Sequence, residues 1–383
     1  MTGLYIHIPF CSALCPYCDF AVVVGRSELH TAYCDALVAE AAATGSWPAA
    51  RTVFVGGGTP TMVDAGLLAG TLARIREHVA WDDAAEVTVE ANPDSVTIEG
   101  LRTLRAAGVN RVSIGGQSFD DGVLAGLGRT HTADDIACAV DAARAAGIDT
   151  INIDLIYGAP GETDGSWRAS VRAAIALDVE HVSSYALTIE TGTPFGTAVA
   201  HGRLSAPDED MLADRYELAC DLLGDAGFEH YEVSNWAKPN RRCRHNMGYW
   251  SQGNYLGLGI GAHSHLRGER WWNTRGLSSY LGTPGGARAG GESLEPLERA
   301  REWLTLRLRL SDGLDVVEAR RRLREASEGI DGIGDDLEHA ARSLHEDGLA
   351  VFRNSRLVPT RRGMLLENVV ALRLLGASEL PRV

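Results

Sequence analysis

The chain has 383 residues and 45% hydrophobic content, which is enough for one large core and a smaller second domain. Its formal net charge of −15 argues against broad binding to a nucleic-acid backbone. The chain has no basic, apolar leader and no run of about 18 consecutive apolar residues. We therefore expect a cytoplasmic protein that is not itself transmembrane.

Six short apolar runs alternate with helical patterns in the first half of the chain. The candidate strands are Leu4–Ile8, Thr52–Val55, Glu86–Glu90, Arg111–Ile114, Thr150–Leu155 and His181–Ala186. The helical patterns between them are Ala32–Thr44, Leu67–Val79, Ile98–Ala107, Thr132–Ala146 and Trp167–Leu177. This alternation predicts an α/β fold, with a parallel sheet and helices outside it. Gly108 and Gly147 directly follow two of the helices, as expected of left-handed caps.

The alternation of strands and helices ends at Thr193–Ser205. A helix at Asp208–Ala226 and a short strand at Tyr231–Val233 are expected after it. We expect these elements to complete a first domain over residues 1–235. Residues 236–290 read as a loop-rich extension that ends in a glycine- and proline-containing linker at Gly282–Gly291. Residues 291–383 then form a C-terminal domain. Its expected elements are helices Leu297–Leu310, Val316–Ala326 and Asp335–Asp347, strands Leu349–Arg353 and Arg356–Pro359, and a last helix from Gly363 to Leu375. Helices followed by a hairpin resemble a winged-helix fold.

The strongest chemical signal is Cys11-Ser-Ala-Leu-Cys15-Pro-Tyr-Cys18, which follows the first strand. Thiolates suit zinc or iron–sulfur clusters, and zinc would normally need a fourth cysteine or histidine nearby. Three cysteines can bind three irons of a 4Fe–4S cluster and leave one iron open. Three structural cysteines on one helical face are the alternative, which Pro16 makes awkward. Cys34, Cys138 and Cys220 fall on apolar helix positions, where we expect buried, inert thiols.

Polar and glycine-rich segments follow several of the strands, where parallel α/β sheets bind their ligands. Gly56-Gly-Gly-Thr59-Pro lets the backbone approach a ligand closely, and its N–H and C=O groups could hold the ends of an amino acid. Glu90, Gln117 and Asp154 stand at the ends of three later strands, where they could hold a ribose, carboxylate or ammonium. Arg129 can pair with a carboxylate. A tight turn and ordinary strand-end caps are the structural alternatives.

The cysteine spacing followed by the glycine-rich strand end resembles the radical S-adenosylmethionine (SAM) superfamily. Tyr5-Ile-His-Ile-Pro-Phe-Cys, Gly56-Gly-Gly-Thr-Pro-Thr and Asn152-Ile-Asp-Leu-Ile-Tyr-Gly resemble the oxygen-independent coproporphyrinogen III oxidase group over nearly the whole chain. This resemblance implies a partial (β/α)6 TIM-like barrel that holds a 4Fe–4S cluster on Cys11, Cys15 and Cys18. It also implies SAM contacts from Tyr5, Gly57, Gly58, Thr59, Glu90, Gln117, Arg129 and Asp154, with Tyr17 packed on adenine and a further contact from Ala186.

The sequence departs from the oxidase pattern at two places. The oxidases continue Cys-x-Cys after the third ligand, whereas Cys18 is followed here by Asp19 and Phe20. In addition, His245-Asn-Met-Gly-Tyr249-Trp250 matches the His-Asn-x-x-Tyr-Trp motif of the HemW heme chaperones. That resemblance implies a protein that binds heme and delivers it to membrane-associated respiratory acceptors, without the oxidase's decarboxylation.

Several side chains could bind the heme iron. A neutral imidazole is a good axial ligand, which favours His245, while Tyr249 and Trp250 could stack on a porphyrin. A hydrogen-bonded loop histidine is the structural alternative for His245. Cys243 is a rival ligand, and His263 and His265 are further candidates, each more typical of a structural role when taken singly.

Three functions remain open at this point. A heme chaperone that carries a cluster and SAM is the first, and a radical SAM coproporphyrinogen III oxidase or related porphyrin-modifying enzyme is the second. A DNA-binding regulator is the third, suggested by the arginine run at 320–324 in the winged-helix-like region. Acidic neighbours such as Glu318 and Glu325 make a solvated helix face the better interpretation of that run, so we expect no nucleic-acid partner.

Overall fold

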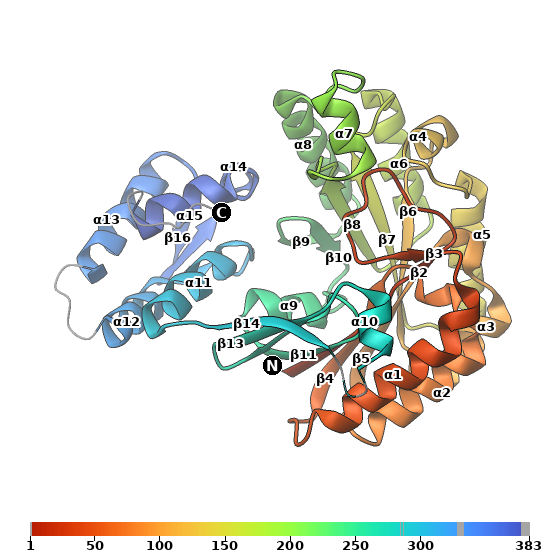
Figure 1. The fold of residues 1–383 in the computed structure, drawn as a ribbon. Helices are drawn as coiled ribbons and strands as arrows, with labels where there is room; N and C mark the ends of the chain where they lie inside the picture. Colours follow the sequence, from red (N-terminus) through yellow and green to blue (C-terminus); the bar gives the residue numbers. More distant parts are fainter. Residues whose placement is uncertain (1, 284, 286, 328–332, 377–383) are drawn as a thin grey trace.

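A computed structural model describes residues 2–283, 285, 287–327 and 333–376 (Figure 1). Six parallel strands lie side by side in chain order, as the alternation predicted. They are β1 (Thr2–Ile8), β4 (Ala50–Gly57), β5 (Trp81–Ala91), β6 (Arg111–Gln117), β7 (Thr150–Tyr157) and β8 (His181–Ala186). The sheet curves into a partial barrel, and the prediction of an α/β fold with a partial TIM-like (β/α)6 barrel is confirmed.

Helices cover the convex outer face of these strands (Figure 1). They are α1 (His30–Ala43), α2 (Ala65–Arg76), α3 (Ile98–Ala106), α5 (Ala133–Ala145), α6 (Asp164–Ala176) and α8 (Glu209–Asp225), with short α4 (Asp121–Gly126) and α7 (Pro194–Ala200) at the rim. Thr132 and Thr163 start α5 and α6 with capping boxes. Gly108 and Gly147 have positive φ angles of 102° and 79°, which confirms the predicted left-handed caps.

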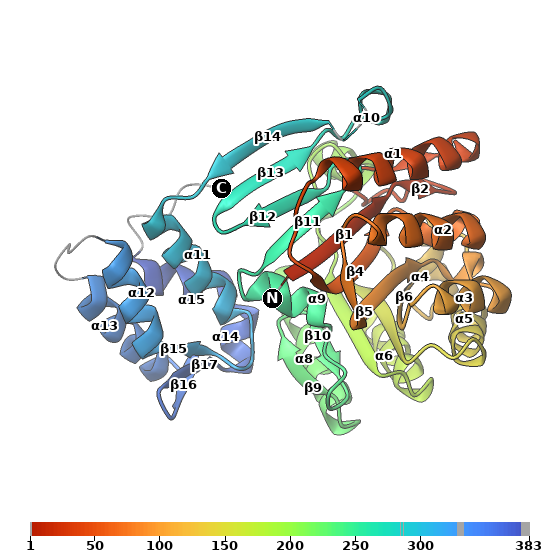
Figure 2. The same cartoon turned by 90° about the horizontal axis from the view of Figure 1, so that it is seen from below.

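The sheet continues beyond the barrel on both sides (Figure 2), and of this extension the sequence predicted only the short strand near Tyr231–Val233. On one side β11 (Asn254–Leu258) adds in parallel to β1, and β12 (His263–Leu266), β13 (Glu269–Asn273) and β14 (Arg288–Ser293) follow antiparallel. On the other side β10 (Asn235–Ala237) and β9 (Glu229–Glu232) extend β8. The short helices α9 (Arg244–Trp250) and α10 (Leu277–Leu281) lie between these strands in sequence.

The prediction of a loop-rich extension over residues 236–290 was therefore wrong, because these residues contain α9, α10, β11, β12 and β13. The predicted linker at Gly282–Gly291 was wrong from Arg288 on, where β14 begins, and residues 284 and 286 lie outside the described chain. The glycines that suggested loops are there for packing. A Cβ on Gly257 in β11 would stand 2.1 Å from the carbonyl oxygen of His263, and one on Gly290 in β14 would stand 2.5 Å from the Trp272 ring. Both strands need glycine because a neighbour approaches closely.

The C-terminal region has a hydrophobic core of its own, around Leu304, Leu323 and Leu344. It contains α11 (Pro296–Leu308), β15 (Leu314–Asp315), α12 (Val316–Ala326), α13 (Ile333–Glu346), β16 (Ala350–Arg353), β17 (Arg356–Pro359), α14 (Arg361–Leu365) and α15 (Glu367–Leu375). The single last helix that the pattern predicted is broken at Leu366, whose ψ of 34° is not helical. The domain boundaries at 235 and 290 stay predictions.

Two further expectations can be compared with the fold. Cys34 and Cys220 are buried as predicted, but Cys138 is exposed, because α5 turns Ile136, Ala139 and Val140 toward the sheet instead. Among the helices of the described chain, none combines the length and the apolar character needed to cross a bilayer.

Candidate functional site

A cavity of about 530 Å³ opens at the carboxyl ends of the parallel strands. Its lining brings together twelve of the side chains singled out from the sequence: Cys11, Cys15, Tyr17, Cys18, Gly57, Gly58, Thr59, Glu90, Gln117, Arg129, Asp154 and Ala186. These residues come from segments spread over the whole barrel. Their convergence follows from the topology, since consecutive parallel strands end at the same edge.

The three cysteines lie on one loop at the mouth of this cavity. The small strands β2 (Phe10–Cys11) and β3 (Val23–Val24) pair with each other and hold the two ends of the loop together. A backbone hydrogen bond from Cys18 N to Cys15 O, 3.0 Å long, closes a tight turn within it. Burial raises the pKa of the Cys11 and Cys18 thiols, and the neighbouring cysteines add to the rise. Bound iron would lower the pKa values of these thiols instead, because its positive charge stabilises the thiolate form.

Two donors already point at the sulfurs. The Thr59 hydroxyl donates to Cys11 Sγ over 3.7 Å, and Arg129 Nη1 donates to Cys15 Sγ over 3.6 Å. In the part of the chain that the structure describes, no trio of cysteine, histidine or acidic side chains converges on a point where a single ion would sit. A cubane cluster is held differently, because each thiolate binds a different iron and the sulfurs stand apart. The loop thus suits a cluster better than a lone metal ion.

The glycine run at the end of β4 is packed against the strand that leads into the cysteine loop. A Cβ on Gly57 would stand 2.3 Å from the His7 ring, and one on Gly58 would stand 2.6 Å from the carbonyl carbon of Pro9. The amides are already used, since Gly57 N donates to Glu90 and Gly58 N donates to Ile8 O. The expectation that these N–H groups hold a ligand carboxylate was wrong, which leaves carbonyl oxygens for an ammonium.

Replacing Gly58 with alanine should therefore damage the site through backbone contact. The added methyl group would push against Pro9, just before Cys11, and overpacking of this kind costs about 1–3 kcal/mol. We expect a lower midpoint of thermal unfolding and less bound iron after reconstitution. Gly70→Ala is the matched control, because Gly70 is an exposed position of α2 and its Cβ would meet nothing within 4 Å. Alanine at such a helix position stabilises the helix by up to about 1 kcal/mol relative to glycine. Equal behaviour of the two variants would contradict the proposed packing.

Two carboxyl groups face the cavity from β5 and β7, the strands on either side of β6. Glu90 accepts a hydrogen bond of 2.9 Å from Gly57 N, and burial, reinforced by the charge of Asp154, raises its pKa to about 7. Asp154 accepts from the Ser113 hydroxyl over 2.9 Å and from Asn152 Nδ2 over 2.8 Å, and burial also raises its pKa. Two acids held together away from water are destabilised as a pair of anions, so the cavity favours a cationic ligand.

Arg129 supplies the opposite charge on the other side of the same cavity. Its Nη2 donates to Asn92 Oδ1 over 2.7 Å and to Gly115 O over 3.0 Å, which fixes the guanidinium. Its Nε is buried and has no hydrogen-bond partner among the residues that the structure describes. Gln117, beside it, has a φ of 63° at a register shift in β6, a strained conformation of the kind found at ligand sites. A fixed arginine with a free donor fits a ligand carboxylate.

The remaining wall is partly apolar. Tyr17 lies at the lining together with Ile156, Ala186 and Leu187, and its ring packs 6.4 Å from that of Phe195. Such a surface suits a flat heterocycle. The sequence analysis missed Asn92, Ser113, Tyr185, Thr188 and Glu190, which also line the cavity. Ser113 and Asn92 could have been found from their positions, since they stand on or directly after the strands that carry Gln117 and Glu90.

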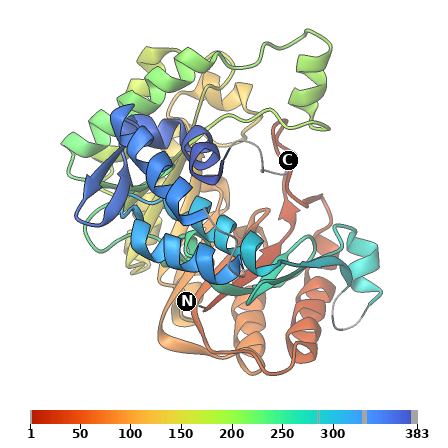
Figure 3. The same cartoon turned by 90° about the vertical axis from the view of Figure 1, so that its left-hand side faces the viewer.

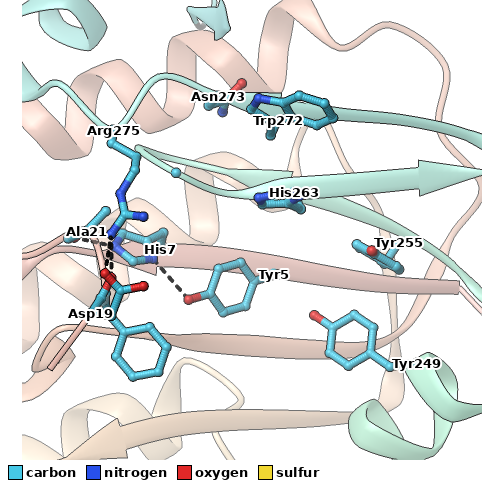
Figure 4. A pocket seen from close by; sticks show the side chains of 12 residues that line it. Tyr5, His7, Asp19, Ala21, Tyr249, Tyr255, His263, Trp272, Asn273 and Arg275 are labelled. Carbon is cyan, nitrogen blue, oxygen red and sulfur yellow. Dashed lines mark hydrogen bonds and ion pairs between the residues drawn. The ribbon is translucent and has the colours of Figure 1, made fainter. Parts of the chain in front are cut away.

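A second cavity of about 560 Å³ lies next to the first, over the extended part of the sheet (Figure 4). It is lined by Tyr5, His7, Asp19, Phe20, Ala21, Tyr249, Tyr255, Gly261, His263, Trp272, Asn273 and Arg275. Asp19 and Phe20 belong to both cavities. Tyr5, predicted to contact SAM, lines this second cavity and not the first. His7 Nε2 must carry the ring proton, because it donates to the carbonyl oxygen of Ala21. His7 Nδ1 therefore accepts, and the Tyr5 hydroxyl donates to it over 3.0 Å.

His245 is not placed as a ligand in this conformation. Its Nδ1 bonds to the Thr52 hydroxyl over 2.9 Å and its Nε2 to the Tyr249 hydroxyl over 2.8 Å, and the ring stacks on Phe54. The side chain is buried, and burial lowers its pKa to about 3. The prediction that His245 offers a free nitrogen to heme is therefore wrong for this structure, because both nitrogens hold the motif together.

The other candidate iron ligands differ in availability. Cys243 is buried with its thiol directed at Glu86. His265 is also buried and uses both ring nitrogens, one with Gly253 O and one with Gly268 N. His263 is exposed at the rim of the second cavity, and neither of its ring nitrogens forms a hydrogen bond with any described residue.

The last residue of the motif points toward the C-terminal domain, which packs against the barrel near α9 (Figure 3). The guanidinium of Arg309 lies over the Trp250 ring, 4.4 Å from its centroid, and pairs with Glu367 at 3.1 Å. Arg309 also lies 3.9 Å from buried Glu232. Tyr249 thus lines the second cavity, whereas Trp250 forms a contact between the barrel and the C-terminal domain.

Comparisons with known proteins agree with this geometry. Residues 5–174 match the radical SAM superfamily, and residues 294–366 match the HemN C-terminal domain. The chain is 42% identical to the heme chaperone HemW of Mycobacterium tuberculosis, over 98% of this chain and 95% of that one, and 35% identical to HemW of Bacillus subtilis, over 98% and 100%. The solved coproporphyrinogen III oxidase of Escherichia coli has the same fold, with a TM-score of 0.84, 23% identity, and coverage of 98% of this chain and 90% of that one.

Proposed function

Because the chain belongs to the HemW family of radical SAM proteins, we propose that it is a heme chaperone that also carries a 4Fe–4S cluster and SAM. In this role it binds heme and passes it to acceptor proteins of respiration. The observation that carries the cofactor part of the proposal is the cavity that joins three cysteines, two acids and a fixed arginine. The curated relatives that span nearly the whole chain support the heme part.

The residues present fit these cofactors. Cys11, Cys15 and Cys18 would hold the cluster, whose reduced form can supply one electron to a SAM molecule bound at its open iron. Glu90 and Asp154 would face the cationic groups of SAM, and Arg129 would face its carboxylate. Gly57, Gly58, Thr59 and Gln117 would shape the pocket around them, while Tyr17 and Ala186 form the wall for adenine. Tyr5 would support this site only from the neighbouring cavity.

Two features favour a chaperone over an oxidase. Phe20 replaces the additional cysteine of the oxidase pattern, and its side chain is 69% exposed between the two cavities. In the motif His245–Trp250, buried His245 is hydrogen-bonded to Tyr249, which lines the second cavity. The solved oxidase is 23% identical to this chain, so the similarity supports a common fold and does not support a common activity.

The proposal predicts one heme per chain and no oxidase activity. Anaerobically reconstituted protein should bind hemin with an end point at one equivalent and release it to an apo-cytochrome supplied as acceptor. With dithionite, SAM and coproporphyrinogen III, the same sample should form no protoporphyrinogen above the rate seen without protein. Rapid conversion of that substrate, or a failure to bind hemin, would contradict the proposal; SAM cleavage alone would not, since the cluster site accounts for it.

A further inference from the structure

We propose that the second cavity is the heme site, with His263 as the axial ligand of the iron and Arg275 as the partner of a propionate. This inference rests on the proposed function and assigns it a place in the molecule. The cavity of about 560 Å³ lies within the range of ligand pockets, and it is open on one side, as a site that must release its cargo requires.

The walls of the cavity suit a flat, apolar macrocycle. Four neighbouring strands of the sheet each contribute one ring: Trp272 from β13, His263 from β12, Tyr255 from β11 and Tyr5 from β1. Tyr249 closes one end, with its ring 4.7 Å from that of Tyr255 (Figure 4). Phe20 stands at the border with the cluster cavity. Aromatic faces of this kind bury a porphyrin without leaving polar groups unpaired.

His263 is the histidine of this cavity whose ring nitrogens form no hydrogen bond with a described residue, so it can bind iron. It lies opposite Trp272 across the β12–β13 pair, and the two rings stack with centroids 5.6 Å apart. His7, the other histidine of the cavity, has both nitrogens engaged. Partial burial and the nearby Arg270 and Arg275 lower the pKa of His263, which keeps the imidazole neutral as a metal ligand must be.

Arg275 provides the positive charge that a heme propionate needs. Its guanidinium donates to the Asp19 carbonyl oxygen and lies 3.6 Å from the Asp19 carboxylate. The side chain of Arg275 is 61% exposed, so it can turn from Asp19 to a ligand carboxylate without burying an unpaired charge. Asp19 directly follows Cys18, so the same contact ties the rim of this cavity to the cysteine loop.

The motif His245–Trp250 then affects heme binding by holding Tyr249 in place, and not by binding the iron. The hydrogen bond between the Tyr249 hydroxyl and His245 Nε2 fixes the tyrosine ring that closes the cavity. His245 is thus a positioning residue, and its loss should weaken heme binding without changing which atom binds the iron. This expectation separates the two histidines experimentally.

The test is a hemin titration of the full-length, reconstituted protein, followed by absorption and electron paramagnetic resonance spectra of the bound heme. His263→Ala should lower heme affinity at least tenfold and remove the histidine-ligated signature, and added imidazole should restore that signature. His245→Ala should lower affinity while the signature stays that of the unchanged protein. Arg275→Ala should weaken binding with the same signature. His78→Ala is the control, since His78 is exposed and lies outside the cavity.

The outcomes separate this inference from the proposed function. If the unchanged protein binds hemin and His263→Ala keeps both the affinity and the signature, the assignment of the ligand is overturned while the chaperone proposal stands. Loss of the signature in His245→Ala and not in His263→Ala would also overturn it. If the unchanged protein binds no hemin, the chaperone proposal itself fails.

Discussion

Replacing Cys15 with alanine is expected to abolish the iron–sulfur cluster. Cys15 lies between the other two cysteines on the loop, and two remaining thiolates can bind only two irons of a cubane. The change would also leave the Arg129 Nη1 donor without its sulfur acceptor. After anaerobic reconstitution with iron and sulfide, the variant should retain little of the iron and acid-labile sulfide that the unchanged protein binds. The broad absorption of the cluster near the visible range should be lost with them.

Cys138→Ala is the matched control for this change. Cys138 is a free cysteine on the exposed face of α5 and does not line the cavity, so its substitution should leave the iron content unchanged. Comparable iron in the Cys15 and Cys138 variants would contradict a cluster held by the loop. Far-ultraviolet circular dichroism of both variants should stay close to that of the unchanged protein, because Cys15 is not part of the hydrophobic core.

Replacing Glu90 with glutamine is expected to weaken SAM binding by roughly 10- to 150-fold, the range of about 1.5–3 kcal/mol for a hydrogen bond to a charged group. The raised pKa of Glu90, about 7, gives the effect a pH dependence. A cationic ligand favours the ionised carboxylate, so SAM affinity should rise as the pH increases toward 7 and level off above it. In Glu90→Gln most of this rise should disappear, and what remains would come from Asp154.

Isothermal titration of anaerobic protein with SAM between about pH 5.5 and 7.5 measures this dependence, below the range where an α-amino group loses its proton. Glu190→Gln is the control, because Glu190 also lines the cavity but is exposed. Its affinity for SAM should change less than about twofold, as exposed charges contribute little. A pH profile that is the same for the unchanged protein and Glu90→Gln would show that Glu90 does not face the ligand's cation.

The barrel could be predicted from the sequence because its signals are local. Each strand is a short apolar run, and several helices carry local caps, such as the capping box of Thr132 or the left-handed Gly147. The site residues followed from the same pattern, since side chains directly after parallel strands must meet at one edge. Glu90 and Asp154 line the same cavity in this way although they stand 64 positions apart in the sequence.

The extension of the sheet could not be predicted because its signals are tertiary. Gly257 and Gly290 weaken the strand pattern, and only the folded chain shows that a carbonyl oxygen and a tryptophan ring occupy the space where their side chains would be. The error over His245 has the same origin. The sequence motif shows that a histidine is present, but it does not show what its two ring nitrogens bind. They bind Thr52 and Tyr249 because α9 packs against β1 and β4.

The most direct measurement is an electron paramagnetic resonance spectrum of the reduced, reconstituted protein, recorded with and without SAM. The account predicts about four irons per chain, a signal of a reduced 4Fe–4S cluster, and a clear change of that signal when SAM binds the open iron. Protein that takes up no cluster under these conditions, or a cluster signal that saturating SAM leaves unchanged, would contradict it.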